Sequence, residues 1–345
     1  MTSDPLPLPR VSLRSLGGTV AMTSPKPGQG ASPTIDASEL IEAIPALDKI
    51  AIIDAASFCQ IPGASLDFRK LVELRNDLER ACSAGARGMV VTQGTDTMEE
   101  SAFLLDLLWS RREPIVFTGA MRTADSPGAD GPGNLVAAVS VAACPDAMGR
   151  GSLVVMNDEI HLARSVRKSH TTSPSAFVSP PTGPVGRVHE GQVAFNWPSY
   201  RNESFPVAVG QKMARVALIR VCLGDDTFLL ERAMESYDGV VVEALGGGHV
   251  PSWWVDPLLK AAKKLPVVLA SRVGSGALLR KTYDFPGSEQ QLLAGGLIPA
   301  EDLDGTKARI LLSVAITTSS VESAIAANFA RVAQRSENGI SAHDY

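Results

Sequence analysis

The sequence predicts an α/β fold built around a parallel sheet, and three observations point to it. Short apolar runs alternate with helical patterns between residues 10 and 157, a stretch rich in Pro, Gly, Ser and Thr interrupts them at about 170–212, and the alternation then resumes. Such alternation is typical of right-handed βαβ units, whose helices cover both faces of a parallel sheet. We therefore expect a parallel-sheet N-terminal domain with helices on both faces, followed by a second α/β domain.

The N-terminal domain is expected over residues 1–190. Its predicted strands are residues 10–16, 49–55, 86–92, 113–119 and 151–157. The helical patterns between them cover residues 37–44, 71–82, 98–110 and 134–143. The interrupting stretch leaves room for one hairpin, and its Pro and Gly content predicts a linker at 191–212.

The C-terminal domain is expected over residues 213–345. Its predicted strands are residues 214–221, 239–245 and 265–271. Its predicted helices are residues 226–236, 252–264, 306–316 and 320–336.

Composition and charge exclude several classes of protein. The 345 residues carry a formal net charge of −5, so no basic excess exists to bind nucleic acid or an anionic membrane. No run of roughly 18 apolar residues and no signal-peptide pattern is present, so we expect a cytoplasmic protein without a membrane span. The 4 cysteines lie far apart, without zinc spacing, which predicts reduced thiols and no metal.

Polar residues cluster where the predicted strands end. Thr19 follows the first strand, Ser57 the second, Thr95 and Asp96 the third, and the segment 119–122 the fourth. Ligands of open parallel sheets bind outside the carboxyl ends of the strands. We therefore expect these residues to form a small polar cup with backbone N–H groups at the helix starts.

The third junction, "QGTDTMEESAFLLDLLW", combines a helix start with residues that a helix start does not need. Thr97 and Glu100 have the spacing of a capping box. A buried helical stripe is predicted at Met98, Ala102, Leu105 and Trp109. Neither the cap nor the stripe accounts for Thr95 and Asp96. Taken by themselves, these two residues would be interpreted as ordinary turn residues. The hydroxyl residues at the other strand ends favour a ligand-binding site instead.

The sequence lacks the usual hydrolase and nucleotide motifs: G-x-S-x-G, G-x-G-x-x-G, the P-loop and H-E-x-x-H. The 5 histidines show no paired ligand spacing and are interpreted as surface or core residues. A lysine can replace histidine as a base when its neighbours lower its pKa. Lys168, in "HLARSVRKSH", is the candidate, although this segment could also be a solvated basic face.

Five segments in order, "LGGTVA", "QGTDTMEESA", "GAMR", "ADGPGNL" and "LVVMND", resemble the bacterial-type L-asparaginases of the asparaginase/glutaminase family, as do "SRVGSGAL" and "KARILLSVAIT". The resemblance implies a large N-terminal and a smaller C-terminal α/β domain. It also implies dimers, usually tetramers, with sites completed across subunits. Such enzymes hydrolyse the side-chain amide of asparagine, sometimes glutamine, to the acid and ammonia without metal or cofactor.

The same resemblance assigns roles by motif. Thr19 resembles the family's nucleophile. Thr95, Asp96 and Lys168 resemble a second group, which moves protons, activates water or, on some accounts, supplies the nucleophile. The Thr95 backbone N–H is a candidate oxyanion donor.

Further residues are implied to hold the substrate. Asp96 would bind its α-amino group and Ser57 its α-carboxylate. Gly94 and Ala120 would line the cup.

The sequence also departs from the family. The family's tyrosine in the loop after the first threonine has no counterpart in residues 21–38, and Phe58 stands where a glutamine is common. An acidic residue of the neighbouring subunit corresponds by counting to Tyr283, with Asp284 beside it. His249 stands where the family often has an asparagine.

These departures leave two alternatives to an L-asparaginase. One is an amidohydrolase of the same family that prefers glutamine, a D-amide or a peptide-linked amide. The other is a non-catalytic module that binds aspartate or asparagine.

Overall fold

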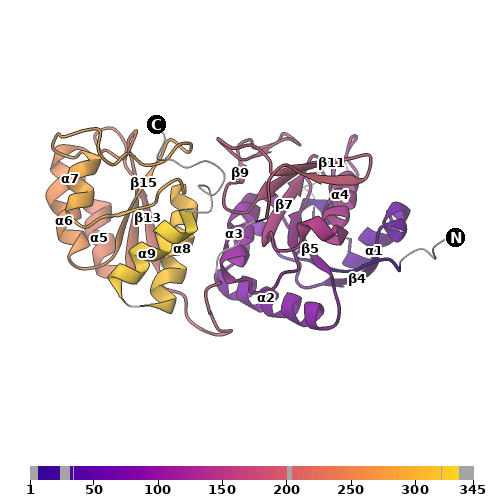
Figure 1. Cartoon of the computed structure of the whole chain (residues 1–345). Helices are drawn as coiled ribbons and strands as arrows, with labels where there is room; N and C mark the ends of the chain where they lie inside the picture. Colours follow the sequence, from indigo (N-terminus) through magenta and orange to yellow (C-terminus); the bar gives the residue numbers. More distant parts are fainter. Residues whose placement is uncertain (1–6, 24–31, 34, 200–203, 320, 334–345) are drawn as a thin grey trace. The chain divides into compact units, whose positions relative to one another are not determined.

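The chain folds into two compact units, which are described separately (Figure 1). The units are Met1–Arg201 and Asn202–Tyr345. The structure is a computed structural model that describes residues 7–23, 32–33, 35–199, 204–319 and 321–333.

An eight-stranded sheet forms the centre of the N-terminal unit, in the order β12-β11-β8-β7-β6-β5-β1-β4. Five neighbouring strands are parallel: β1 (Arg10–Ser15), β4 (Ile52–Ser57), β5 (Gly88–Thr92), β6 (Ile115–Thr118) and β7 (Ser152–Met156). Three antiparallel strands extend it: β8 (Glu159–Leu162), β11 (Gly186–His189) and β12 (Gln192–Phe195). The five predicted strands are confirmed, and β11–β12 is the expected hairpin, whereas β8 was not predicted.

Helices cover both faces of this sheet, which confirms the predicted fold class. They are α1 (Ala37–Glu42), α2 (Phe68–Ser83), α3 (Met98–Leu108) and α4 (Gly131–Ala143). α1 and α4 pack on one face, where Leu40 and Leu135 share a core with Leu13, Val90 and Val116 of the strands. α3 packs on β6 and β7 and against α2 on the other face (Figure 1).

The strand register brings the predicted polar junctions to one edge of the sheet. Ser15 at the end of β1 pairs with Ser57 of β4 and with Thr92 of β5, and Thr92 pairs with Thr118 of β6. β4 therefore runs to Ser57, two residues beyond the predicted end of that strand. The segment 119–122 begins directly after Thr118, so all four junctions lie at this edge.

The capping box predicted at Thr97 is wrong. A 3-10 turn, Thr95–Thr97, precedes α3, and the Thr97 side chain makes no cap hydrogen bond. Its hydroxyl instead donates to the carbonyl of Gly63 at 2.8 Å and accepts from Gln93 Nε2 at 3.1 Å. The hydroxyl thus ties two loops together, which local spacing cannot reveal. The predicted stripe is confirmed, because Met98, Ala102, Leu105 and Trp109 are fully buried.

The C-terminal unit has a four-stranded parallel sheet in the order β13-β14-β15-β16. Its strands are β13 (Val216–Arg220), β14 (Gly239–Ala244), β15 (Val267–Ser271) and β16 (Ile298–Pro299). On one face lie α5 (Phe228–Ser236), α6 (Val255–Ala262) and α7 (Glu289–Ala294), and on the other α8 (Gly305–Thr318) and α9 (Glu322–Ala333) (Figure 1). The sequence predicted neither α7 nor β16, which are short.

The region expected to connect the domains, 191–212, contains β12, which belongs to the N-terminal sheet. The two units divide within this region, between Arg201 and Asn202. No helix of the described residues has the length and hydrophobicity that a membrane crossing requires.

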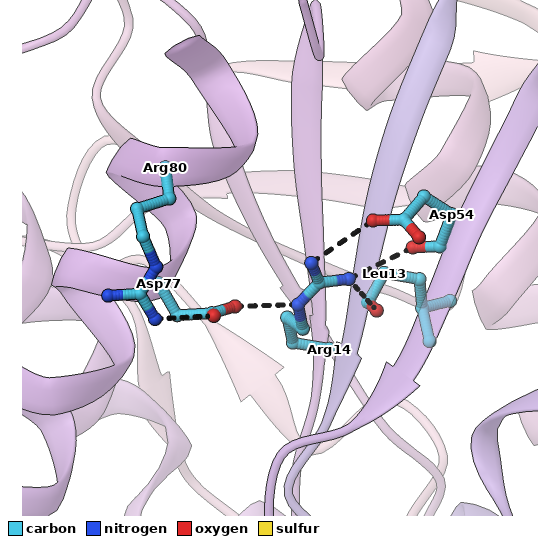
Figure 2. A network of polar contacts seen from close by, with 5 residues as sticks. All are labelled: Leu13, Arg14, Asp54, Asp77 and Arg80. Carbon is cyan, nitrogen blue, oxygen red and sulfur yellow. Dashed lines mark hydrogen bonds and ion pairs between the residues drawn. The ribbon is translucent and has the colours of Figure 1, made fainter. Parts of the chain in front are cut away.

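Arg14 ties edge strand β4 and helix α2 to the inner strand β1 (Figure 2). Its Nε lies 2.6 Å from Asp77 Oδ2 and its Nη2 lies 3.1 Å from Asp54 Oδ2. Asp77 also accepts from Arg80 at 2.9 Å. Burial by itself lowers the pKa of Arg14, but the hydrogen bonds and charges of Asp77 and Asp54 raise it above its ordinary value. The guanidinium is therefore held as a cation at the centre of the network.

We expect Arg14→Met to lower the free energy of unfolding by about 2 kcal/mol, because it leaves the largely buried Asp77 without its main partner. Arg80→Met is the matched control, since the Arg80 side chain is 73% exposed and its pair with Asp77 should contribute less than about 1 kcal/mol. Urea unfolding of both variants measures the two losses. Equal losses would contradict a central role for Arg14.

Candidate active site

Three loops meet in close backbone contact at the carboxyl edge of the N-terminal sheet. Gly18 has φ of 91°, and a Cβ on it would lie 2.2 Å from the backbone nitrogen of Gly94. A Cβ on Gly119 would lie 2.5 Å from the carbonyl oxygen of Gln93. Only glycine allows these approaches. The loop that carries Thr19 is therefore packed against the loop that carries Gly94 and the residues after it.

Thr95, Asp96 and Lys168 form one hydrogen-bonded cluster. Lys168 Nζ lies 2.9 Å from Thr95 Oγ1 and 2.8 Å from Asp96 Oδ1. Thr95 is buried, whereas the side chain of Asp96 is 68% exposed. The cluster thus joins a buried hydroxyl to the amino group of Lys168, with a carboxylate that remains accessible to a ligand.

Glu99, which sequence analysis missed, holds the strand that carries Lys168. Its Oε2 accepts from the Lys168 backbone N–H at 2.6 Å, from the first turn of α3. Lys168 lies in β9 (Arg167–Lys168), which pairs with β10 (Phe177–Val178). The helix that begins after Thr95 therefore also fixes the backbone of the residue whose side chain reaches Thr95.

Asp130 and Asn134 fix the loop that contains Ala120. Asp130 accepts from the backbone N–H groups of Met121 and Arg122, and Asn134 Nδ2 donates to Asp130 and to the carbonyl of Gly119. Ala120 is buried. Asp130 and Asn134 both belong to the segment "ADGPGNL". Sequence analysis used this segment for the family resemblance, and the same match could have identified the two residues as part of the site.

Ser57 and Thr19 are placed differently from Thr95. Ser57 is exposed at the end of β4, and its Oγ accepts from the backbone N–H of Ala37 at 3.1 Å. Thr19 is half-buried in a 3-10 turn, and its hydroxyl forms no hydrogen bond with any residue that the structure describes. Neither side chain is therefore committed to the Thr95 cluster.

Part of the loop 21–38, which lacks the family's tyrosine, lies outside the described residues. Within this loop, β2 (Met22–Thr23) pairs antiparallel with β3 (Ser32–Pro33). Residues 24–31 and 34 lie outside the description.

Tyr283 and His249 belong to the C-terminal unit. Tyr283 is 43% exposed, Asp284 beside it is exposed, and His249 is half-buried. The ring centroids of His249 and Tyr283 lie 4.8 Å apart. The two residues singled out by departures from the family pattern are therefore in direct contact. Within the N-terminal unit, the structure places the other predicted site residues at one sheet edge.

The hydrogen bonds of the Thr95–Asp96–Lys168 cluster involve no cysteine or histidine among the described residues. Burial raises the pKa of the Cys82 thiol to about 12, so this cysteine is not a reactive thiolate. His170 caps a turn through its Nδ1, and His343 lies outside the described residues. Among the described residues, no group of three or more His, Cys, Asp or Glu side chains is arranged to hold a metal ion.

His161, in β8, is a buried neutral histidine. Its side chain is fully buried, and its Nδ1 lies 2.9 Å from Ser179 Oγ. Burial, with a contribution from the charge of Arg187, lowers its pKa to about 4. Between the folded value and an unfolded value of about 6.5, the unfolded chain binds a proton that the folded chain does not, so stability falls as the pH drops through this range.

We expect His161→Asn to remove this pH dependence. From pH 7 to pH 4.5, the wild-type protein should lose on the order of 2 to 3 kcal/mol more than the variant. Urea unfolding of both proteins at the two pH values measures the difference, because the remaining titratable groups are common to both. If the wild type and His161→Asn differed in the free energy of unfolding by the same amount at both pH values, a buried neutral His161 would be contradicted.

Comparisons with known proteins match both units of the chain to one family. A family model described as "Asparaginase, N-terminal" matches residues 10–201, and "Glutaminase/Asparaginase C-terminal domain" matches residues 215–329. A "Probable L-asparaginase" of Deinococcus radiodurans is 36% identical over 315 residues, which cover 90% of this chain and 94% of the relative. A "Glutaminase-asparaginase" of Pseudomonas fluorescens biotype A is 32% identical, covering 90% and 87%.

A solved structure extends the likeness to the fold. The crystal structure of a "Probable Cytoplasmic L-asparaginase" from Campylobacter jejuni has a TM-score of 0.86 and 30% identity, and the match covers 94% of this chain and 99% of that one. The family models together cover most of both units. The chain therefore belongs to the asparaginase/glutaminase family.

Proposed function

We propose that the protein is an L-asparaginase, which hydrolyses the side-chain amide of L-asparagine to L-aspartate and ammonia, with glutaminase activity as a side reaction. The observation that carries the proposal is the Thr95–Asp96–Lys168 cluster, packed through glycine contacts beside the Thr19 loop. The family membership and the names of the relatives support the same substrates.

In the proposed first step, Thr19 Oγ1 attacks the carbonyl carbon of the side-chain amide. A threonine hydroxyl needs a base to accept its proton, and that proton is finally transferred to the leaving nitrogen. The backbone N–H of Thr95 stabilises the negative charge on the carbonyl oxygen, a type of contact worth about 3 kcal/mol in other hydrolases. Collapse of this intermediate breaks the C–N bond, releases ammonia and leaves an ester on Thr19.

In the proposed second step, water hydrolyses the ester. The hydroxyl of Thr95 orients the water and accepts its proton while passing its own proton to the amine of Lys168, and a proton returns from this pair to Thr19 Oγ1 when the C–O bond breaks. Aspartate and free Thr19 are the products. The 2.9 Å contact between Lys168 Nζ and Thr95 Oγ1 supports this proton route.

The proposed substrate contacts satisfy both charges of a free amino acid. Asp96, whose carboxylate is largely exposed, binds the α-amino group, and Ser57 binds the α-carboxylate. Gly94 and Ala120 line the cup, and Tyr283 of the neighbouring subunit completes it. A carboxylate and an ammonium are each bound more tightly when hydrogen bonds are charge-assisted.

We further propose that the enzyme works in the cytoplasm as a homodimer or homotetramer with sites at subunit interfaces. The similar protein of Campylobacter jejuni, named a probable cytoplasmic L-asparaginase, supports the location. In this assembly, residues 1–190 of one subunit supply the catalytic threonines, and residues 213–345 of the neighbouring subunit supply Tyr283.

The test is ammonia release from a panel of L-asparagine, L-glutamine, D-asparagine and a peptide-linked asparagine. We expect the highest kcat/KM for L-asparagine and a lower value for L-glutamine. A clear preference for one of the last three substrates would instead establish the alternative amidohydrolase. Binding of aspartate without turnover of any amide would establish the non-catalytic module.

A further inference from the structure

Glu289 is a fully buried carboxylate at the start of α7 in the C-terminal unit. Its Oε1 accepts from the backbone N–H groups of Thr282 at 2.9 Å and of Tyr283 at 3.0 Å. Its Oε2 lies 3.2 Å from His249 Nε2. Burial by itself raises the pKa of Glu289, but the backbone hydrogen bonds and His249 outweigh it, so the pKa is lowered. The group is therefore an ionised carboxylate satisfied by this one segment and this one histidine.

The ring of His249 belongs to a cluster of three rings, together with those of Tyr283 and Phe285. His249 makes edge contacts with Tyr283 at a centroid distance of 4.8 Å and with Phe285 at 5.1 Å, and the last two rings are 5.9 Å apart. Tyr283 and Phe285 are 43% and 42% exposed. Two large rings are thus half-exposed to solvent and can contact a ligand, while the His249 ring between them and Glu289 is held by the buried carboxylate.

The backbone around this cluster is fixed on both sides. Val250 N–H donates to the carbonyl of Gly287 at 2.9 Å, and Leu279 N–H donates to the carbonyl of Gly247 at 2.9 Å. The loop 245–250, which carries His249, is therefore hydrogen-bonded to both ends of the segment 279–287. Between those two ends, Glu289 supplies the hydrogen bonds to Thr282 and Tyr283.

We propose that Glu289 is a positioning residue for substrate binding, which acts through His249 and the Tyr283 backbone to fix the Tyr283 ring. This inference rests on the proposed function, in which Tyr283 of one subunit contacts the amino acid substrate bound by the neighbouring subunit. Glu289 itself touches no substrate. It sets the direction in which the phenol is presented, and the exposed ring edge makes the contact.

The first test compares Glu289→Ala with Glu289→Gln. The alanine variant leaves two backbone N–H groups without their acceptor, so we expect KM for L-asparagine to rise about tenfold while kcat changes less than about threefold. The glutamine variant retains an acceptor oxygen for both groups and should recover most of this loss. Glu301→Ala is the matched control, because Glu301 pairs with Arg280 of the same segment, whereas Thr282 and Tyr283 donate to Glu289.

The second test asks whether Glu289 acts through Tyr283. In the Tyr283→Ala background, adding Glu289→Ala should raise KM no further, because the positioned ring is already gone. An additional tenfold rise would overturn the inference and assign Glu289 a separate role. His249→Ala in both backgrounds repeats this test if Glu289→Ala does not fold.

Hydrogen exchange gives a readout that does not depend on turnover. The peptide covering residues 279–288 should lose amide protection in Glu289→Ala and keep it in Glu301→Ala. If the wild-type protein hydrolyses no amide, the proposed function fails and this inference fails with it. If the wild type is active and folded Glu289→Ala has an unchanged KM, the inference alone fails.

Discussion

Thr19→Ala is expected to lower kcat/KM for L-asparagine by a factor on the order of 10⁴, because it removes the proposed nucleophile and with it the covalent step. The variant should fold normally, since the Thr19 hydroxyl forms no hydrogen bond with the described residues and the backbone approach depends on Gly18 instead. Initial rates of ammonia release, with circular dichroism as a check on folding, measure the effect.

Thr19→Ser is the matched control, because it keeps the hydroxyl and removes only a methyl group. It should retain measurable turnover well above that of the alanine variant. A folded Thr19→Ala protein with more than about a tenth of the wild-type kcat would assign the attack to Thr95 instead. The same pair of variants therefore decides which threonine forms the ester.

Lys168→Met is expected to lower kcat by about 10²- to 10⁴-fold, the range typical of lost general acid–base catalysis. The methionine keeps the length of the side chain and the backbone bond to Glu99, but removes the contacts of Nζ with Thr95 and Asp96. Stability should change by less than about 1 kcal/mol, because the lost ion pair involves an exposed carboxylate. Steady-state kinetics and urea unfolding measure the two effects.

Chemical rescue separates proton transfer from packing. In Lys168→Ala, added methylamine should restore part of kcat with a dependence on amine concentration, because the amine can occupy the space left by the side chain. Arg14→Ala is the control, because wild-type Arg14 pairs with Asp54 and Asp77 instead of with the cluster. Added methylamine should not change the kcat of this variant. A Lys168→Met protein with wild-type kcat would exclude Lys168 from the chemistry.

The parallel strands, the main helices and the site motifs could be predicted because their signals are local. Buried strands such as 86–92 are continuous apolar runs, and Met98, Ala102 and Leu105 repeat at helical spacing. The side chains at the strand ends then follow from topology, because parallel strands place their carboxyl ends at one edge. The resemblance to a family supplied the roles that local patterns cannot give.

The features that sequence reasoning missed depend on contacts between distant residues. The bond between Glu99 and the Lys168 backbone joins positions 69 residues apart, and the Thr97 hydroxyl bonds to a residue 34 positions away. The antiparallel β8 and the short α7 are stabilised by their neighbours more than by their own patterns. Glu289 belongs to the same group, since only the folded chain brings it to His249, 40 positions earlier.

The most direct test of the account is the stoichiometry of products formed from L-asparagine by the purified full-length wild-type protein. We predict saturable release of ammonia with an equal amount of aspartate, and no requirement for an added metal or cofactor. Absence of both products, from protein shown to be folded and incubated with saturating L-asparagine, would contradict the central claim.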